Sequence, residues 1–231
     1  MAYRLVSGAK LFGPRSFCPH CKKIIAWYDL VPIFSWIFLL GKCRSCKAPI
    51  SFLYPLVELL TMLIFLTFWF ILPHYHIAYF VFFSALLITI RTDIETMLIS
   101  RYVTVFLIPL GMLFAAFGFL PINLMSSILG FILGYGSLWA ASKMFYLLTG
   151  KEGIGQGDLE LLAFIGSFIG AAGCWVALFL GAIIGSIIGV IYLTMSGKNK
   201  EVRIPFGPFL AFGAILYVLF QKQLLFFLFG L

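Results

Sequence analysis

The sequence predicts an all-α fold, a polytopic bundle of about seven transmembrane helices preceded by a small N-terminal zinc-knuckle module. Of its 231 residues, 63% are hydrophobic and only 10% are charged, which excludes a water-soluble globule of ordinary composition. The apolar stretches after Ser51 are long and continuous, which favours helices over the short alternating segments of a membrane barrel. We therefore expect two domains, a cytosolic metal-binding module over residues 1–51 and a transmembrane domain over 52–231.

The N-terminal module contains two C-x-x-C pairs, Cys18 with Cys21 and Cys43 with Cys46, separated by 21 residues. This spacing is typical of a zinc site with four thiolate ligands, in which the metal replaces the core that so short a segment lacks. Two disulfides or free thiols are the alternatives. A cytosolic, reducing location favours the metal, so we predict a structural zinc ion held by these four cysteines.

Hydropathy, with Pro73, Pro121 and Gly173 as breaks, predicts a series of membrane-spanning helices. The expected spans are 52–72, 77–99, 103–120, 122–148, 158–171, 173–195 and 204–221.

The positive charges indicate how these spans are oriented. The net charge is +8, and eight of the 16 Lys and Arg residues lie in the first 47 positions. If the N-terminus is cytosolic and the spans alternate, the basic clusters at 91–101, 143–151 and 198–203 all return to the cytosolic side. The charge is thus explained by membrane topology, and we expect lipids but no nucleic acid as a partner.

Two acidic residues, Asp93 and Asp158, are expected at this cytosolic face. Taken singly, Asp93 is explained by a charge pair with Arg91 or Arg101, and Asp158 by an N-cap of the helix that follows it. Taken together, two carboxylates at one interface form a candidate catalytic pair that shares a proton, as in aspartic proteases.

Three further residues are candidates for supporting this site. Gly155 and Gly157 precede Asp158 and provide a thin backbone along which an extended peptide can approach it. Glu58 lies about two turns into the first span, where a charge is costly, and either a structural hydrogen bond or a site role explains it.

Gly155-Gln156-Gly157-Asp158 is a GxGD motif, and together with Asp93 it resembles the type IV prepilin peptidases, polytopic aspartic proteases of the bacterial inner membrane. The similarity extends over nearly the whole chain. Its other matching segments are 18–21, 29–32, 35–36, 41–46, 48–51, 54–58, 161–163 and 204–209.

The resemblance implies an endopeptidase that cleaves the short leader of prepilins or pseudopilins after a glycine at the cytosolic face, with Asp93 and Asp158 as catalytic residues. It also implies N-methylation of the new terminus with S-adenosylmethionine, an activity often linked to the cysteine module. Two other hypotheses stay open: a peptidase with a purely structural zinc module, and a non-catalytic membrane scaffold or transporter whose acids cap and join helices.

The sequence departs from the family pattern at three places near these motifs. A Pro-Asp pair is usual in the family where Ser100-Arg101 stands, a lysine where Glu160 stands, and an asparagine where Leu30 stands. The family also begins with a transmembrane helix before a sequence like Tyr3-Arg4-Leu5, where this chain starts. Either the true start lies upstream, where about twenty apolar codons would restore the family topology, or one helix is missing.

Overall fold

The computed structural model describes residues 16–71, 74–151, 153–196 and 205–230, and every regular element within them is a helix. Two isolated β-bridges, in the N-terminal module, are the extended pairings in this part of the chain. The predicted all-α class is confirmed. The chain divides into two compact units, the first ending at His76 and the second beginning at Ile77.

The first unit contains the short helices η1 (Trp27–Leu30) and α2 (Phe34–Phe38) and the longer α3 (Leu53–Ile71). Trp36 of α2 contacts the segment between the second C-x-x-C pair and α3. Its indole nitrogen donates to the Ile50 carbonyl at 3.1 Å, and its ring packs edge-on against Phe52. Gly41 has a positive φ of 68°, and a Cβ there would lie 2.8 Å from the Trp36 ring, so the chain needs glycine at this turn.

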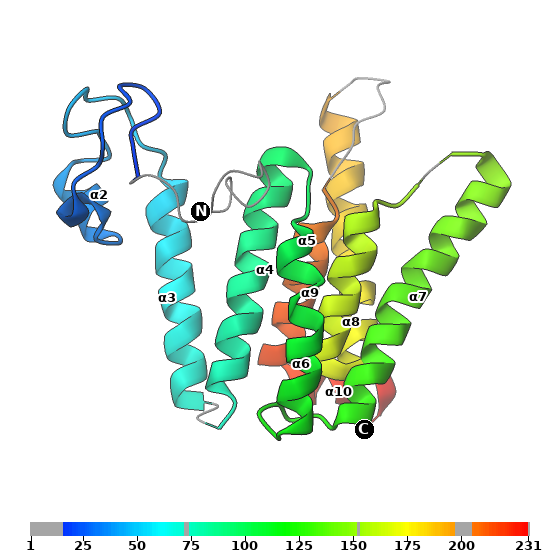
Figure 1. Cartoon of the computed structure of the whole chain (residues 1–231). Helices are drawn as coiled ribbons and strands as arrows, with labels where there is room; N and C mark the ends of the chain where they lie inside the picture. The colour runs from blue at the N-terminus through cyan, green and yellow to red at the C-terminus, as the bar shows by residue number, and fades with distance from the viewer. Residues whose placement is uncertain (1–15, 72–73, 152, 197–204, 231) are drawn as a thin grey trace. The chain divides into compact units, whose positions relative to one another are not determined.

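The second unit is a helical bundle in which α8 packs against both α7 and α9 (Figure 1). The elements are α4 (His76–Thr96), α5 (Arg101–Thr104), α6 (Leu107–Ala116), α7 (Leu124–Thr149), α8 (Gln156–Ser196), α9 (Gly207–Leu219) and α10 (Gln221–Phe229).

The α8 segment is two helices that meet at Gly170, where φ is 75° and ψ is −178°. The Cys174 sulfur lies 3.9 Å from the Leu162 carbonyl oxygen. In a straight helix, residues twelve apart are separated by about 18 Å along the axis, so the chain must fold back between them. The predicted break at Gly173 is therefore correct in kind but three residues late, because the left-handed backbone falls at Gly170.

Glycines allow α7 and the first part of α8 to approach closely. A Cβ on Gly130 would lie 2.2 Å from the Gly166 carbonyl oxygen, and one on Gly134 would lie 2.5 Å from the Leu162 carbonyl oxygen. Small residues at a crossing bring two backbones together, a common way for helices to pack in membranes. This contact holds the start of α8, and therefore Asp158, against α7.

An aromatic cluster forms the core between α4, α6 and α8. Phe82 of α4 stacks on Phe168 with ring centroids 5.1 Å apart and also contacts Phe164 at 5.5 Å, while Phe114 of α6 meets Phe168 edge-on. The Phe82, Phe164 and Phe168 side chains are fully buried. This packing connects α4, which carries Asp93, to α8, which carries Asp158.

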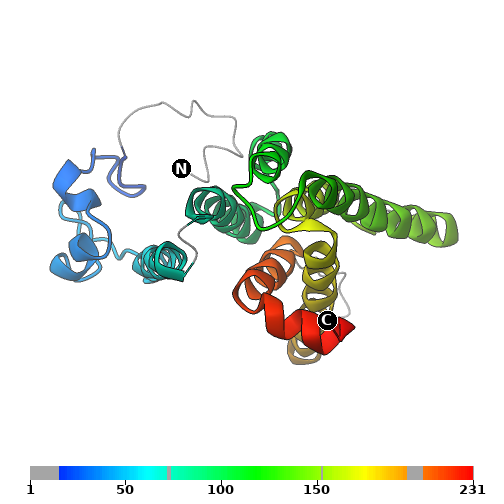
Figure 2. The same ribbon diagram turned by 90° about the horizontal axis from the view of Figure 1, so that it is seen from below.

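Three helices of the described residues are long and apolar enough to cross a membrane: His76–Thr96, Leu124–Thr149 and Gln156–Met195. The pair Gly207–Leu219 and Gln221–Phe227 is a fourth candidate if it forms one span bent by 98° (Figure 2). Tyr54–Phe70 and Arg101–Ala116 are apolar but shorter. A helical membrane protein is thus confirmed. By length and composition the described residues give three or four spans when the two parts of α8 are counted as one, so the number seven stays a prediction.

The close crossing of α7 and α8 predicts that Gly130→Ala destabilises the bundle. The new methyl group would meet the Gly166 backbone, which cannot rotate away, so we expect a loss of about 1–3 kcal/mol and a lower melting temperature in detergent. Gly136→Ala on the same helix is the control, because nothing lies within 4 Å of a Cβ there. Equal melting temperatures for the two variants would contradict the close crossing.

Candidate active site and metal centre

Asp93 lies in the last turns of α4 and is only 5% exposed. Its carboxylate accepts a hydrogen bond of 3.1 Å from the backbone N–H of Gly207, the first residue of α9. The N-terminus of a helix presents free N–H groups and a positive dipole end, which stabilise an anion. A helix distant in sequence thus supplies the partner of this buried acid.

Gly207 has to be a glycine for this contact. A Cβ there would lie 2.7 Å from the Asp93 carboxylate oxygen Oδ2 and 3.2 Å from the Ile99 side chain. In the sequence, Gly207 belongs to the 204–209 segment that matches the family pattern, and that pattern predicted no role for it. The structure places it directly against a predicted catalytic residue.

Asp158 lies in the first turn of α8 and is partly exposed. Because the helix begins at Gln156, Asp158 is two residues inside it, so the predicted N-cap position was wrong. The chain turns tightly before it, with the Asp158 N–H donating to the Gly155 carbonyl at 3.1 Å. Its carboxylate lies back over Gly155, 3.4 Å from where a Cβ would be. The helix dipole still favours a carboxylate in this first turn.

Ile99 lies between the two glycines that adjoin the acids, Gly157 next to Asp158 and Gly207 against Asp93. Its side chain is 2.9 Å from the Cβ position of Gly157, next to Asp158, and 3.2 Å from that of Gly207, which binds Asp93. The two carboxylates therefore lie at the same end of the second unit, one buried and hydrogen-bonded, the other partly open.

The two arginines considered as partners of Asp93 make other ion pairs. Arg91 pairs with Glu95 one turn further along α4, and Arg101 pairs with Glu160 of α8 at 2.9 Å. Asp93 itself receives the Gly207 N–H.

Glu58 accepts a hydrogen bond of 2.7 Å from the Ile33 N–H, within the first unit. Ile33 has a positive φ of 62°, a strained conformation for a β-branched residue, so this bond holds a turn that would otherwise be unfavourable. The structure thus provides a structural partner for Glu58, and its role in the site stays a prediction.

The four knuckle cysteines come together in the first unit. Their sulfur atoms all lie within 4.8 Å of one another, and those of Cys18 and Cys46 are 3.8 Å apart. Tetrahedral zinc with Zn–S bonds of about 2.3 Å requires sulfur atoms roughly 3.8 Å apart. All four are free thiols. The cluster therefore fits a zinc ion, and the disulfide alternative is not what the structure shows.

The two knuckles have the same local geometry. In each, the residue after the second cysteine has a positive φ, 58° at Lys22 and 59° at Lys47, and its N–H donates to the carbonyl of the first cysteine. Backbone hydrogen bonds from Cys46 and Ser45 lower the pKa of the Cys43 thiol to about 6. A thiol that ionises this readily is suited to binding a metal.

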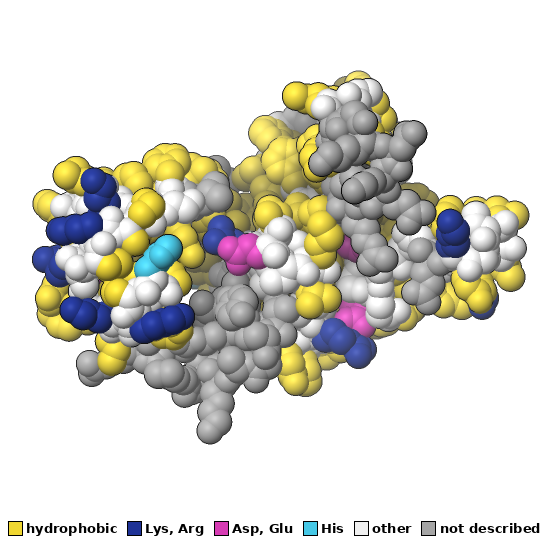
Figure 3. Space-filling view, turned by 90° about the horizontal axis from the view of Figure 1, so that it is seen from above, with side chains coloured by type: hydrophobic (Ala, Val, Ile, Leu, Met, Phe, Trp, Pro, Cys, Tyr) yellow, Lys and Arg dark blue, Asp and Glu magenta, His cyan; other side chains and the backbone are white. Residues whose placement is uncertain are grey.

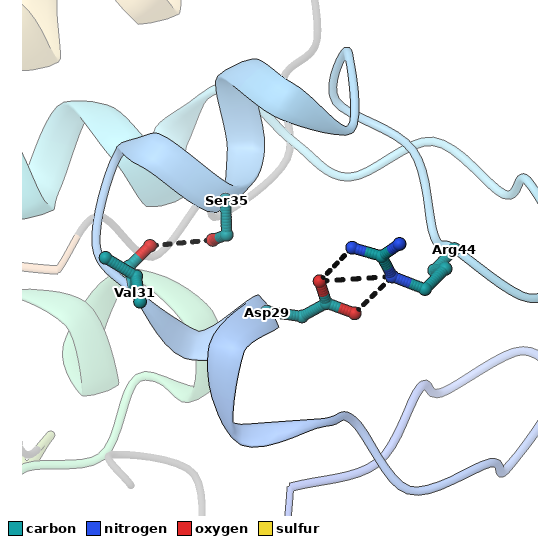
Figure 4. Close-up of polar contacts among 4 residues, drawn as sticks. All are labelled: Asp29, Val31, Ser35 and Arg44. Atoms are coloured by element: carbon teal, nitrogen blue, oxygen red, sulfur yellow. Dashed lines mark hydrogen bonds and ion pairs between the residues drawn. The ribbon is translucent and has the colours of Figure 1, made fainter.

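An ion pair ties the segment between the knuckles to the second knuckle (Figure 4). Arg44 donates to both carboxylate oxygens of Asp29, with its shortest contact at 2.6 Å, and its hydrogen bonds lower the pKa of Asp29. Nearby, the Ser35 hydroxyl donates to the Val31 carbonyl at 2.7 Å. The ion pair thus holds the 29–32 segment beside the second C-x-x-C pair.

The surface of the module combines basic and large apolar side chains (Figure 3). Trp27, Phe38 and Leu40 are each at least 80% exposed within the structure. Within the described part of the module, the exposed basic residues are Lys22, Lys23, Lys42, Arg44 and Lys47.

The cysteine geometry predicts that the purified protein carries about one zinc ion per chain. Cys18→Ser or Cys43→Ser removes one of four soft ligands, so we expect most of the metal to be lost on dialysis, as measured by elemental analysis. Cys174→Ala is the matched control, because this buried cysteine of α8 lies outside the cluster. Full zinc content in Cys18→Ser would rule out the four-thiolate site.

Two family models match the chain. The Bacterial Peptidase A24 N-terminal domain covers residues 1–72, and the Type IV leader peptidase family covers residues 80–193. The described cysteine cluster lies in the first match, and Asp93 and Asp158 lie in the second.

Several curated proteins named prepilin leader peptidase/N-methyltransferase are similar to the chain. The protein of Dichelobacter nodosus is 40% identical over 93% of this chain and 74% of its own length. That of Aeromonas hydrophila is 37% identical over 87% and 70%, and that of Pseudomonas aeruginosa is 35% identical over 91% and 73%. No solved structure matches. With two family models matched in order and relatives aligned over most of its length, the chain belongs to the type IV leader peptidase family.

Proposed function

We propose that the protein is a membrane aspartic endopeptidase that cleaves the short leader of type IV prepilins or pseudopilins after a glycine, with Asp93 and Asp158 as its catalytic residues. The observation that carries this proposal is that the two acids lie at the same end of the bundle. There Ile99 contacts both Gly157, next to Asp158, and Gly207, which donates to Asp93. The relatives named prepilin leader peptidase/N-methyltransferase support the substrate class.

The different surroundings of the two acids suit a shared-proton mechanism. Two neighbouring carboxylates disfavour each other's ionisation, so in this mechanism they hold one proton between them, with one ionised and the other protonated. The ionised carboxylate takes a proton from water as this attacks the scissile peptide carbonyl, and the protonated carboxyl donates a hydrogen bond to the carbonyl oxygen. The proton then passes to the leaving amine.

The substrate approach follows from the exposure of the Asp158 segment. Gly155 is exposed and Gly157 partly exposed, and neither carries a side chain that would block an extended peptide. Asp93, in contrast, is buried. Gly155 and Gly157 are thus proposed as the substrate-facing backbone.

The proposed membrane arrangement is seven crossings in the bacterial inner membrane, with the site and the cysteine module of residues 1–51 on the cytosolic side. Helices occupy each of the seven predicted ranges when the two parts of α8 are counted separately, which supports this number. The ends of α4 and α8 that carry the acids adjoin the basic clusters expected in the cytosol. The basic, aromatic surface of the module suits contact with lipid headgroups.

A second activity, N-methylation of the new terminus with S-adenosylmethionine, is favoured by the names of the relatives and by the cysteine cluster that accompanies the peptidase helices. We assign no residue to the methyl donor. The alternative is a peptidase only, whose zinc holds the module together.

Asp93→Asn and Asp158→Asn should each abolish leader cleavage. Replacing either acid removes the shared proton, so we expect the rate to fall by at least about 10³-fold, as for other groups that act as a catalytic unit. Cleavage is measured on a purified prepilin in detergent by mass spectrometry, with labelled S-adenosylmethionine present and an already cleaved pilin supplied in parallel. Methylation of that cleaved pilin should persist in both variants.

Glu95→Gln is the control for this experiment, because Glu95 lies two residues after Asp93 but is exposed and paired with Arg91. Normal cleavage by either aspartate variant would contradict the peptidase proposal. No methyl transfer by the wild-type protein would favour the peptidase-only alternative.

Gly207→Ala tests the contact that holds Asp93. The added methyl group would lie 2.7 Å from the Asp93 carboxylate, so α9 or the acid must move. A misplacement of about 1 Å is expected to lower kcat by roughly 10²-fold. Gly136→Ala, in open space on α7, should cleave at the wild-type rate. If both variants are equally active, the Gly207 contact does not matter for catalysis.

A further inference from the structure

Glu160 is a buried acid that the proposed mechanism does not use. It follows Asp158 by two residues in the first turns of α8 and is only 4% exposed. A carboxylate this buried is costly unless an opposite charge and hydrogen bonds compensate for its lost hydration. Its partners therefore indicate what it holds in place.

Arg101 provides that opposite charge. Its Nε lies 2.9 Å from Oε1 and 3.2 Å from Oε2 of Glu160, so the guanidinium faces both oxygens. Arg101 is the first residue of α5, and its own side chain is 73% exposed. The pair thus joins the start of α5 to the start of α8 across 59 positions of sequence.

A neutral side chain extends this contact to α7. The Gln156 amide lies 3.4 Å from Oε1 of Glu160 and 3.2 Å from the Tyr135 hydroxyl. Gln156 is the variable residue of the GxGD motif, between Gly155 and Gly157. The network of Arg101, Glu160, Gln156 and Tyr135 therefore adjoins the turn that presents Asp158.

The connection from α4 to α5 comprises only residues 97–100. Besides the ion pair at its end, it contacts the candidate active site. Met97 has a positive φ of 53°, and Ser100 is buried, so the chain turns sharply between the two helices. Ile99, two residues before Arg101, fits against Gly157 and Gly207. An ion pair at Arg101 thus fixes the connection that places Ile99 between Gly157 and Gly207.

We propose that Arg101 and Glu160 are positioning residues for the peptidase reaction: their ion pair holds the 97–100 connection against the start of α8 and thereby sets Asp158 relative to Asp93. This inference rests on the proposed function, because it assigns the pair a role in the same site. Neither side chain needs to touch the substrate. The expected signature is a loss of kcat in a protein that is folded and binds its substrate normally.

The test is a charge-reversal cycle on the full chain in detergent, with Arg101→Glu, Glu160→Arg and the double variant. Each single variant places like charges together at the first turn of α8, and we expect kcat for prepilin cleavage to fall roughly 10²-fold with KM unchanged. The double variant restores opposite charges and should regain most of the lost kcat. Lys143→Glu, an exposed reversal on α7, is the control and should have wild-type kcat.

Folding is measured on the same samples by the melting temperature and the yield of monodisperse protein. If a single reversal does not fold, Arg101→Gln and Glu160→Gln take its place, since they remove the attraction without adding repulsion. The positioning role is overturned if the singles keep wild-type kcat, if the double variant is no better than the singles, or if activity falls only in proportion to folded protein. Asp93→Asn in the same series separates the two proposals, because its normal activity would refute the peptidase function itself.

Discussion

The hydrogen bond from the Gly207 N–H to the buried Asp93 carboxylate is the contact on which the arrangement of the site depends. It requires α9 to begin 3.1 Å from an acid carried by α4, and it leaves no room for a side chain at that point. Ile99 fills the adjoining space and reaches Gly157, which fixes the start of α8 relative to the start of α9. A buried carboxylate with one backbone donor and a second acid nearby is an expensive arrangement, which is typical of a site maintained for chemistry rather than stability.

Sequence patterns predicted the parts of this protein that depend on local spacing and composition. The two C-x-x-C knuckles were predicted to form one metal site, and their four sulfur atoms lie within 4.8 Å of one another. The reversal near residue 170 was predicted from the alternation of the basic clusters and from Gly173 as a break. Its position was not predicted, because whether Gly170 or Gly173 takes the left-handed backbone depends on what packs there, here Ser126 of α7. The role of Gly207 and the partner of Glu160 could not be predicted, because each is a tertiary contact between segments far apart in sequence.

The Arg101–Glu160 pair also joins two of the places where the chain departs from the family pattern. The family pattern has an acid where Arg101 stands and a lysine where Glu160 stands, so both charges differ in sign from that pattern. The two changed residues face each other at 2.9 Å. In this chain the two departures therefore form an ion pair with one another. The departure at Leu30 has no such partner in the contacts described above.

The central claim, that Asp93 and Asp158 lie close together at one end of the folded bundle, is tested most directly by cross-linking. In the variant carrying Asp93→Cys and Asp158→Cys, a short bifunctional thiol reagent applied to the full chain should join the two positions, and peptide mapping by mass spectrometry should recover that link in high yield. The matched variant with Glu95→Cys and Asp158→Cys should give far less, because Glu95 lies exposed on another side of α4. Efficient modification of both thiols without a link between positions 93 and 158, or an equal yield in the control, would contradict the account.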